Sequence, residues 1–254
     1  MGMKEMTKDD LDIIKVTKWE CPSETGVPLI TMPNIPKPLH ALPPRNVMGK
    51  TAWDRARKLC YFKADYKCEI CGCEPSKGNL HAHELYTIDY LEGTSTFNRC
   101  IAICKQDHDF IHSGRLITLF KEGNPLYPKS YVLKTVEKGF KLVSEYNKAH
   151  PDLEPLRVYD TFIDYLKVPE LADEMAELIR KYDIKFYASP KRGARWEKWR
   201  LVWNGKEYYT PYKNPEEWME AMKKASQNDT VRQVKDPFTG GAYDELRKML
   251  EQSA

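Results

Sequence analysis

Apolar residues recur at helical spacing just before the cysteine-rich part of the chain. From residue 51 to residue 66, charged side chains alternate with apolar ones, namely Trp53, Ala56, Leu59, Cys60 and Ala64. Side chains three and four positions apart share one face of a helix, so this spacing predicts an amphipathic helix. That helix would lead directly into the first cysteines.

Two short segments farther along have the pattern of strands. Residues 80 to 83 alternate between apolar and polar side chains, and residues 100 to 103 form a short apolar run. The first pattern has the period of a half-buried strand, and the second has the composition of a buried one. The segment from 104 to 112 then carries two histidines at helical spacing. The predicted order is therefore strand, strand, helix.

The remaining pattern predicts an arm, a second folded unit and a tail. Seven prolines in residues 1 to 47 forbid a long helix and predict an extended, proline-rich N-terminal arm. Residues 48 to 145 would form the central module, because two closely spaced prolines follow its last helical pattern. Helix and strand patterns from 155 to 225 predict a separate C-terminal α+β accessory domain that would select or orient the substrate. Residues 226 to 254 are polar and predict a tail with one short helix.

Composition and charge narrow the class of protein. Hydrophobic residues make up 41% of the chain and charged residues 30%, values at which a soluble protein can bury a core. The formal net charge is only +3, so nucleic-acid binding would have to come from local basic patches. No apolar run is long enough to span a membrane, and the charged N-terminus does not resemble a signal peptide. We therefore expect a cytoplasmic protein without a membrane partner, in the host cytoplasm if the protein is viral.

The cysteines are concentrated in the centre of the chain. Five of the seven lie between residues 68 and 104, a cluster that indicates a metal site in a reducing compartment. Cys68, Cys71 and Cys104 have a spacing that suits a tetrahedral structural zinc site built from two knuckles. By position the fourth ligand would be Asp107, and two further cysteines are available in its place, Cys73 and Cys100.

Histidines within this frame indicate a second metal site. His108 and His112 are four residues apart on the expected helix, so both imidazoles would face the same way and could hold one divalent ion. His83, followed by Glu84, lies on the neighbouring strand and could take a proton from water while the ion stabilises developing charge. These are the parts of a one-metal phosphodiesterase.

Three stretches of this sequence resemble the HNH (ββα-metal) endonuclease family in its phage and bacterial form. They are Cys68-Glu-Ile-Cys71-Gly72, then Ala82-His83-Glu84-Leu85-Tyr86-Thr87-Ile88-Asp89, and then Ile101-Ala102-Ile103-Cys104-Lys105-Gln106-Asp107-His108, with His112 and Gly114 following. They are similar to the family's cysteine knuckle, its His-Glu strand and its helix with two histidines. The resemblance covers the centre of the chain and not its C-terminal unit.

The resemblance implies an α+β fold with a ββα-metal module, a structural Zn²⁺ and DNA as the substrate. It implies that His83 is the general base. It also implies that His108 and His112 hold a catalytic divalent ion, which would be Mg²⁺, Mn²⁺ or another transition metal. The expected reaction is hydrolysis of a phosphodiester to 3′-hydroxyl and 5′-phosphate ends.

This chain departs from the family pattern beside the expected base. Ala82 stands where the wider family often has a metal ligand, so Glu84 or His81 would complete the coordination. The asparagine that orients the base in the family corresponds to Asn98, which is one residue away from the usual spacing. Arg99 occupies the expected place.

A basic and aromatic stretch near residue 195 is a candidate nucleic-acid surface. Its cations are Lys191, Arg192, Arg195, Lys198 and Arg200, and Arg99 is a further candidate contact. The tryptophans between them are Trp196, Trp199 and Trp203. Cations contact phosphates and flat rings stack on bases, which suits nucleic acid. The same alternation also suits a strand whose tryptophans enter the core and whose charges are solvated.

The sequence therefore predicts a metal-dependent HNH endonuclease that hydrolyses DNA by nicking or by double-strand cleavage, in a phage or defence setting. An alternative from another class is a catalytically degenerate, zinc-binding HNH-like module that binds nucleic acid or a protein partner. A nuclease that acts on RNA or on modified DNA is a third hypothesis.

Overall fold

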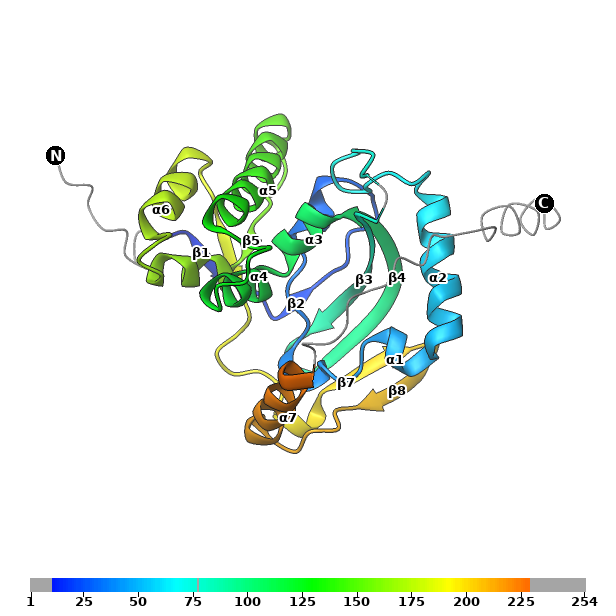
Figure 1. Cartoon of the computed structure of the whole chain (residues 1–254). Coiled ribbons are helices and arrows are strands. Elements are labelled where there is room, and N and C mark those ends of the chain that lie inside the picture. Colours follow the sequence, from blue (N-terminus) through cyan, green and yellow to red (C-terminus); the bar gives the residue numbers. More distant parts are fainter. Residues whose placement is uncertain (1–10, 77, 229–254) are drawn as a thin grey trace.

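The computed structural model describes residues 11 to 76 and 78 to 228 of a mixed α+β protein (Figure 1). Its α-helices are α1 (Pro44–Met48), α2 (Lys50–Lys63), α3 (Lys105–Ile111), α4 (Ser113–Lys121), α5 (Lys129–Ala149), α6 (Ala172–Lys181) and α7 (Pro215–Asn228). Its strands are β1 (Ile13–Lys15), β2 (Lys18–Trp19), β3 (Leu80–Asp89), β4 (Thr94–Cys104), β5 (Val158–Tyr159), β6 (Phe186–Ala188), β7 (Arg200–Trp203) and β8 (Lys206–Tyr209). Short 3-10 helices are η2 (Val27–Thr31), η3 (Lys37–Leu39), η4 (Asp160–Lys167) and η5 (Trp196–Lys198). Within the described residues, no helix has the length and apolar character needed to cross a membrane.

The β3–β4 hairpin forms the centre of the larger sheet. That sheet has the strand order β2-β3-β4-β7-β8, and β3 and β4 pair antiparallel along their whole length. A bulge interrupts the register between Leu85 and Tyr86. α2 packs beside the hairpin, and α3 follows directly from the end of β4 (Figure 1). The expected order of strand, strand and helix is present in β3, β4 and α3.

Both ends of the described chain are joined to the centre through the two sheets. β7 runs parallel to β4, with Arg200 opposite Thr94, and β1 runs parallel to β6 in the smaller sheet. One cluster of buried side chains extends from Trp19 to Leu201. This differs from the expected extended arm and separate C-terminal unit. An alternating pattern identifies a strand, but the edge with which it pairs is decided by packing.

Most elements expected from periodicity occur where the sequence places them. The expected amphipathic helix is α2, and both expected strands lie inside the longer β3 and β4. The helix expected to carry two histidines is split, because α3 ends at Ile111 and α4 begins at Ser113. His112 lies between them with ψ +42°, outside the helical range, so the chain turns there. The short helix expected near the C-terminus lies outside the described residues.

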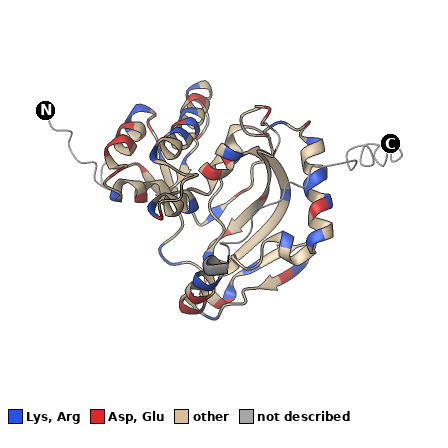
Figure 2. Ribbon diagram, viewed as in Figure 1, with Lys and Arg blue, Asp and Glu red and all other residues tan. Residues whose placement is uncertain are grey.

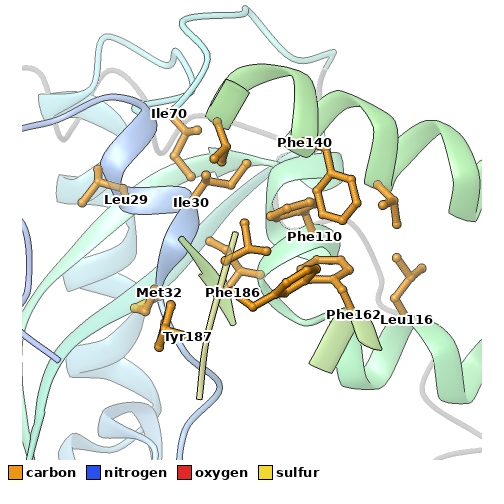
Figure 3. Close-up of a cluster of buried hydrophobic side chains, with 14 of the residues drawn as sticks. Leu29, Ile30, Met32, Ile70, Phe110, Leu116, Phe140, Phe162, Phe186 and Tyr187 are labelled. Carbon is orange, nitrogen blue, oxygen red and sulfur yellow. The ribbon is translucent and has the colours of Figure 1, made fainter. Parts of the chain in front are cut away.

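Three phenylalanines join α3 to the elements that support it. Phe110 of α3, Phe140 of α5 and Phe162 of η4 are each 2% exposed or less. The Phe110 ring centroid is 4.6 Å from that of Phe162 and 5.9 Å from that of Phe140, and Figure 3 shows the three rings together. α3 is only seven residues long, and isolated helices shorter than about 12 residues are marginal in water. Tertiary packing therefore holds this helix in place.

Gly139 of α5 leaves space for the Phe110 ring. We therefore expect Gly139→Ala to destabilise the fold, although alanine usually stabilises a helix. A Cβ at this position would overlap the ring carbons of Phe110. Alanine in a helix is favoured over glycine by about 1 kcal/mol, whereas overpacking a core costs about 1–3 kcal/mol. We expect a lower free energy of unfolding in urea for Gly139→Ala, and no change for Lys134→Ala, an exposed site on the same helix. A stabilised Gly139→Ala variant would contradict this packing.

Candidate metal centres

Four cysteine sulfurs form the first candidate centre. The Sγ atoms of Cys68, Cys71, Cys73 and Cys104 lie within 4.8 Å of one another. Cys71 Sγ is 3.4 Å from Cys73 Sγ and 4.0 Å from Cys104 Sγ. Zn–S bonds of about 2.3 Å place the sulfurs of a tetrahedral site about 3.8 Å apart. The cluster is therefore compatible with one structural zinc ion.

A tight turn brings Cys73 back to Cys68. The backbone N–H of Gly72 donates to the Cys68 carbonyl over 2.8 Å, and the N–H of Cys68 donates to the Cys73 carbonyl over 2.9 Å. Gly72 has φ +70°, a conformation that a residue with a side chain rarely adopts. Cys104 supplies the remaining sulfur from the end of β4, where it is also the N-cap of α3.

Asp107, which the spacing favoured as the fourth ligand, lies beside this cluster while Cys73 lies within it. Asp107 Oδ2 accepts a hydrogen bond from the Cys68 thiol over 3.1 Å, and Asp107 Oδ1 is 2.7 Å from Nζ of Lys138 on α5. Cys100, the other substitute, packs under α2. Spacing along α3 could not reveal the turn that returns Cys73 to the site.

Three imidazoles form the second candidate centre. Nitrogen atoms of His83, His108 and His112 lie within 4.8 Å of one another. His83 comes from β3, whereas His108 lies in the last turn of α3 and His112 directly follows it. The His83 ring centroid is 5.3 Å from that of His108 and 4.9 Å from that of His112. The sequence separated His83 as a base from two metal ligands, but the structure brings all three together as candidate ligands.

Burial keeps these imidazoles neutral at physiological pH. It holds the pKa of His83 and of His108 well below the ordinary value, and nearby histidines lower both further. Burial also lowers the pKa of His112 to about 4. A neutral imidazole offers its lone pair to a metal ion. His83 Nδ1 is buried without a hydrogen-bond partner among the described residues, which fits an atom that binds a ligand.

Side-chain alternation along β3 places His81 and Glu84 on opposite faces. His81 shares the face of His83, and its ring centroid is 4.9 Å from that of His108. Glu84 is opposite Cys100, on the face that α2 covers. Burial raises the pKa of the Glu84 carboxyl. Glu84 therefore points away from the three histidines, whereas His81 lies next to them.

Two arginines lie near the histidine cluster, together with the carboxylate of Asp109. Arg45 of α1 lies close enough to lower the pKa of His83 and of His112, in addition to the larger effect of burial. Arg115 of α4 lowers the pKa of His108 and of His112 in the same way. Both arginines are exposed. Sequence reasoning missed them, because Arg45 is far from the histidines along the chain and Arg115, three residues after His112, lies beyond the histidine motif.

Three other candidate residues lie within the larger sheet. Asn98 is exposed at the bulge in β4. The guanidinium of Arg99 donates to Glu69 Oε2 over 2.9 Å, and Arg200 Nε donates to Glu207 Oε1 over 2.8 Å. Both arginines are therefore engaged in ion pairs with neighbouring strands and loops.

The basic and aromatic stretch is divided between the core and the surface. Its tryptophans enter the core to different extents, with Trp199 only 7% exposed and the other two half-buried. The Trp199 ring packs edge-on against Tyr90, with centroids 6.2 Å apart. The exposed cations before β7 are Lys191, Arg192, Arg195 and Lys198. Burial of Trp199 agrees with the core interpretation, and the exposed cations stay candidate phosphate contacts.

The geometry of these two clusters carries the functional argument for this chain. No model of a known protein family, no curated protein and no solved structure matches it. The resemblance to HNH endonucleases therefore stays a prediction from the sequence motifs.

Two substitutions distinguish Cys73 from Asp107 as the fourth zinc ligand. We expect the four-sulfur site to hold about one zinc ion per purified chain, in addition to any zinc in the histidine cluster. Cys73→Ser should lower the zinc content sharply, because it removes a clustered sulfur. Asp107→Asn should keep its zinc, and Cys21→Ser is the control at a thiol outside the cluster. Elemental analysis by mass spectrometry measures the content. Loss of zinc from Asp107→Asn alone would restore Asp107 as the ligand.

Proposed function

We propose that this chain is a metal-dependent endonuclease of the HNH type, which hydrolyses phosphodiester bonds in DNA. The observation that carries the proposal is the cluster of His83, His108 and His112, in which a strand and a short helix bring three imidazoles together. The sequence similarity of the same residues to HNH endonucleases supports it. The arginines beside the cluster add support, because a phosphodiester is an anion.

The donor set fits a divalent transition metal. Imidazole nitrogen suits Zn²⁺, Ni²⁺ and related ions, whereas Mg²⁺ prefers oxygen ligands. Three protein ligands leave coordination positions for water and substrate. Bound there, a divalent ion would lower the pKa of a coordinated water and stabilise negative charge on the phosphate.

We assign His81 as the residue that accepts the proton from the attacking water. His83 has the place of a third ligand in the cluster, so a different group is needed for proton transfer. His81 lies on the same face of β3, next to His108, and is only half-buried. Glu84 points to the opposite face, which leaves His81 as the better placed base.

The exposed cations would hold the DNA backbone. Arg45 and Arg115 lie beside the histidines and would contact the phosphate that is cleaved. α2, which follows α1, carries further Lys and Arg residues, as Figure 2 shows. Three of these on α2 are exposed, Lys50, Arg55 and Lys63. The exposed cations of the loop before β7 would contact more distant phosphates, because charge contacts of this kind do not depend on sequence.

Cleavage of supercoiled plasmid DNA tests the proposed function. We expect nicked or linear products with a transition-metal ion, and much less product with Mg²⁺ alone. His108→Ala should abolish cleavage, because it removes a clustered ligand. His150→Ala is the matched control, since that histidine is exposed and stacks on Tyr146 outside the cluster.

Absence of cleavage with every divalent ion, on DNA and on RNA, would overturn the nuclease proposal. Binding of DNA without cleavage would then favour the non-cutting module. Cleavage of RNA alone would change the substrate class and leave the metal centre in place.

Substitution of His81 separates the base from the ligands. General base catalysis contributes about 10²–10⁴-fold, so His81→Ala should lower the cleavage rate by that range. The variant should still bind Co²⁺ or Ni²⁺ in calorimetry, whereas His108→Ala should not. Added imidazole should restore part of the rate of His81→Ala. Loss of metal binding in His81→Ala would show instead that His81 is a ligand.

A further inference from the structure

Lys138 of α5 contacts the cysteine cluster, although it is far along the chain from all four cysteines. Its Nζ is 3.3 Å from Cys71 Sγ and 3.2 Å from Cys104 Sγ. The same Nζ is 2.7 Å from Asp107 Oδ1. The Asp107 side chain is 1% exposed and that of Lys138 is 26% exposed, so both charges are largely removed from water. A cation is thus held against two sulfurs and a buried carboxylate.

The positive charge of Lys138 would offset the negative charge of a zinc–thiolate centre. Four thiolates and one Zn²⁺ have a net charge of about −2, and a deprotonated Asp107, whose Oδ2 is 3.1 Å from Cys68 Sγ, would add a further negative charge. Buried charge is costly unless it is paired and hydrogen-bonded. Lys138 brings positive charge and N–H donors to this site, and donors of this kind tune the metal that their partners hold.

The four cysteines differ in their exposure to solvent. Cys68 and Cys104 are buried, with 2% and 6% exposure, and Cys71 is half-buried under Lys138. Cys73 is exposed. A hydrogen bond from a cation stabilises the charge on a thiolate sulfur and so lowers its nucleophilicity. Cys71 and Cys104 should therefore be the less reactive members of the cluster, and Cys73 the more reactive one.

We propose that Lys138 is the counter-ion of a zinc–thiolate centre, that it increases the zinc affinity of this centre, and that it shields Cys71 and Cys104 from electrophiles. The proposal rests on the assignment of zinc to the four cysteines and is independent of nuclease activity. A simpler role for Lys138 would be to neutralise Asp107 alone. The two roles make different predictions for the Asp107→Asn variant.

Zinc affinity tests the proposal directly. The zinc dissociation constant of the full chain is measured by competition with a chromophoric chelator. Loss of a group that supports metal ligands typically weakens binding by about 10–100-fold, and we expect this for Lys138→Met. Lys141→Met is the matched control, because Lys141 is exposed on the same helix. Lys138→Arg keeps the charge and should stay close to the unchanged chain.

Alkylation by iodoacetamide gives a second readout. A cysteine sulfur displaces iodide from the reagent, so an S–C bond forms as the C–I bond breaks and the alkylated sulfur is released from the metal. Peptide mass spectrometry follows each cysteine in the zinc-loaded protein. We expect Cys73 to react first in the unchanged chain. In Lys138→Met, Cys71 should react faster, while Lys141→Met should leave the order unchanged.

The outcomes are distinguishable. Equal zinc affinity and equal Cys71 reactivity in Lys138→Met and in the unchanged chain would overturn the proposal, and so would an unchanged chain that holds no zinc. A Lys138→Met effect that disappears when Asp107→Asn is added would show that Lys138 only neutralises Asp107. If Lys138→Met fails to fold, a tenfold loss of affinity in folded Lys138→Arg would overturn the proposal. No nucleic acid enters these measurements, so failure of the nuclease proposal is seen separately.

Discussion

The position of one short helix, α3, is the constraint on which both candidate centres depend. Cys104 directly precedes its first turn and belongs to the cysteine cluster, while His108 in its last turn belongs to the histidine cluster. The helix has seven residues and a length of about 10 Å, so it cannot maintain its own geometry in isolation. Phe110, near the C-terminal end of the helix, packs against α5 and η4. The two clusters are thus fixed relative to each other through one packed element.

The β3–β4 hairpin provides the opposite wall for this helix. Residues two apart on β3 share a face, so His81 and His83 face α3 together. Ala82 between them and Leu80 before them face α2 and pack in a small apolar cluster. Alternation in the strand therefore separates a chemical face from a packing face. Glu84, which follows a histidine directly in sequence, belongs to the packing face for this reason.

The two centres differ in the charge of their ligands and of the groups beside them. The cysteine cluster gathers negative charge in a poorly hydrated place, and the Lys138 cation contacts it there. The histidine cluster is neutral because burial lowers the pKa of its imidazoles, and its charged neighbours are two arginines and the carboxylate of Asp109. A centre of the first kind suits a metal that stabilises the fold, whereas a centre of the second kind suits an ion that acts on an anionic ligand.

The sequence by itself determined the local elements and the types of ligand. Helical periodicity located α2 and α3 to within a few residues, and the strand patterns located one end each of the longer β3 and β4, because these patterns reflect burial of one face. The spacings identified Cys68 with Cys71 and His108 with His112, because ligands that are close in sequence are also close in space, and the pattern of two cysteine knuckles added Cys104.

Only the tertiary structure decided which distant residues complete each centre. Cys73 joins the cysteine cluster through a backbone turn at Gly72, and Lys138 reaches it from a helix that begins far along the chain. His83 becomes a neighbour of two helix histidines only when α3 packs across β3. The pairing of β7 with β4 is decided in the same way, because long-range contacts depend on how faces pack and leave no periodic trace in the sequence.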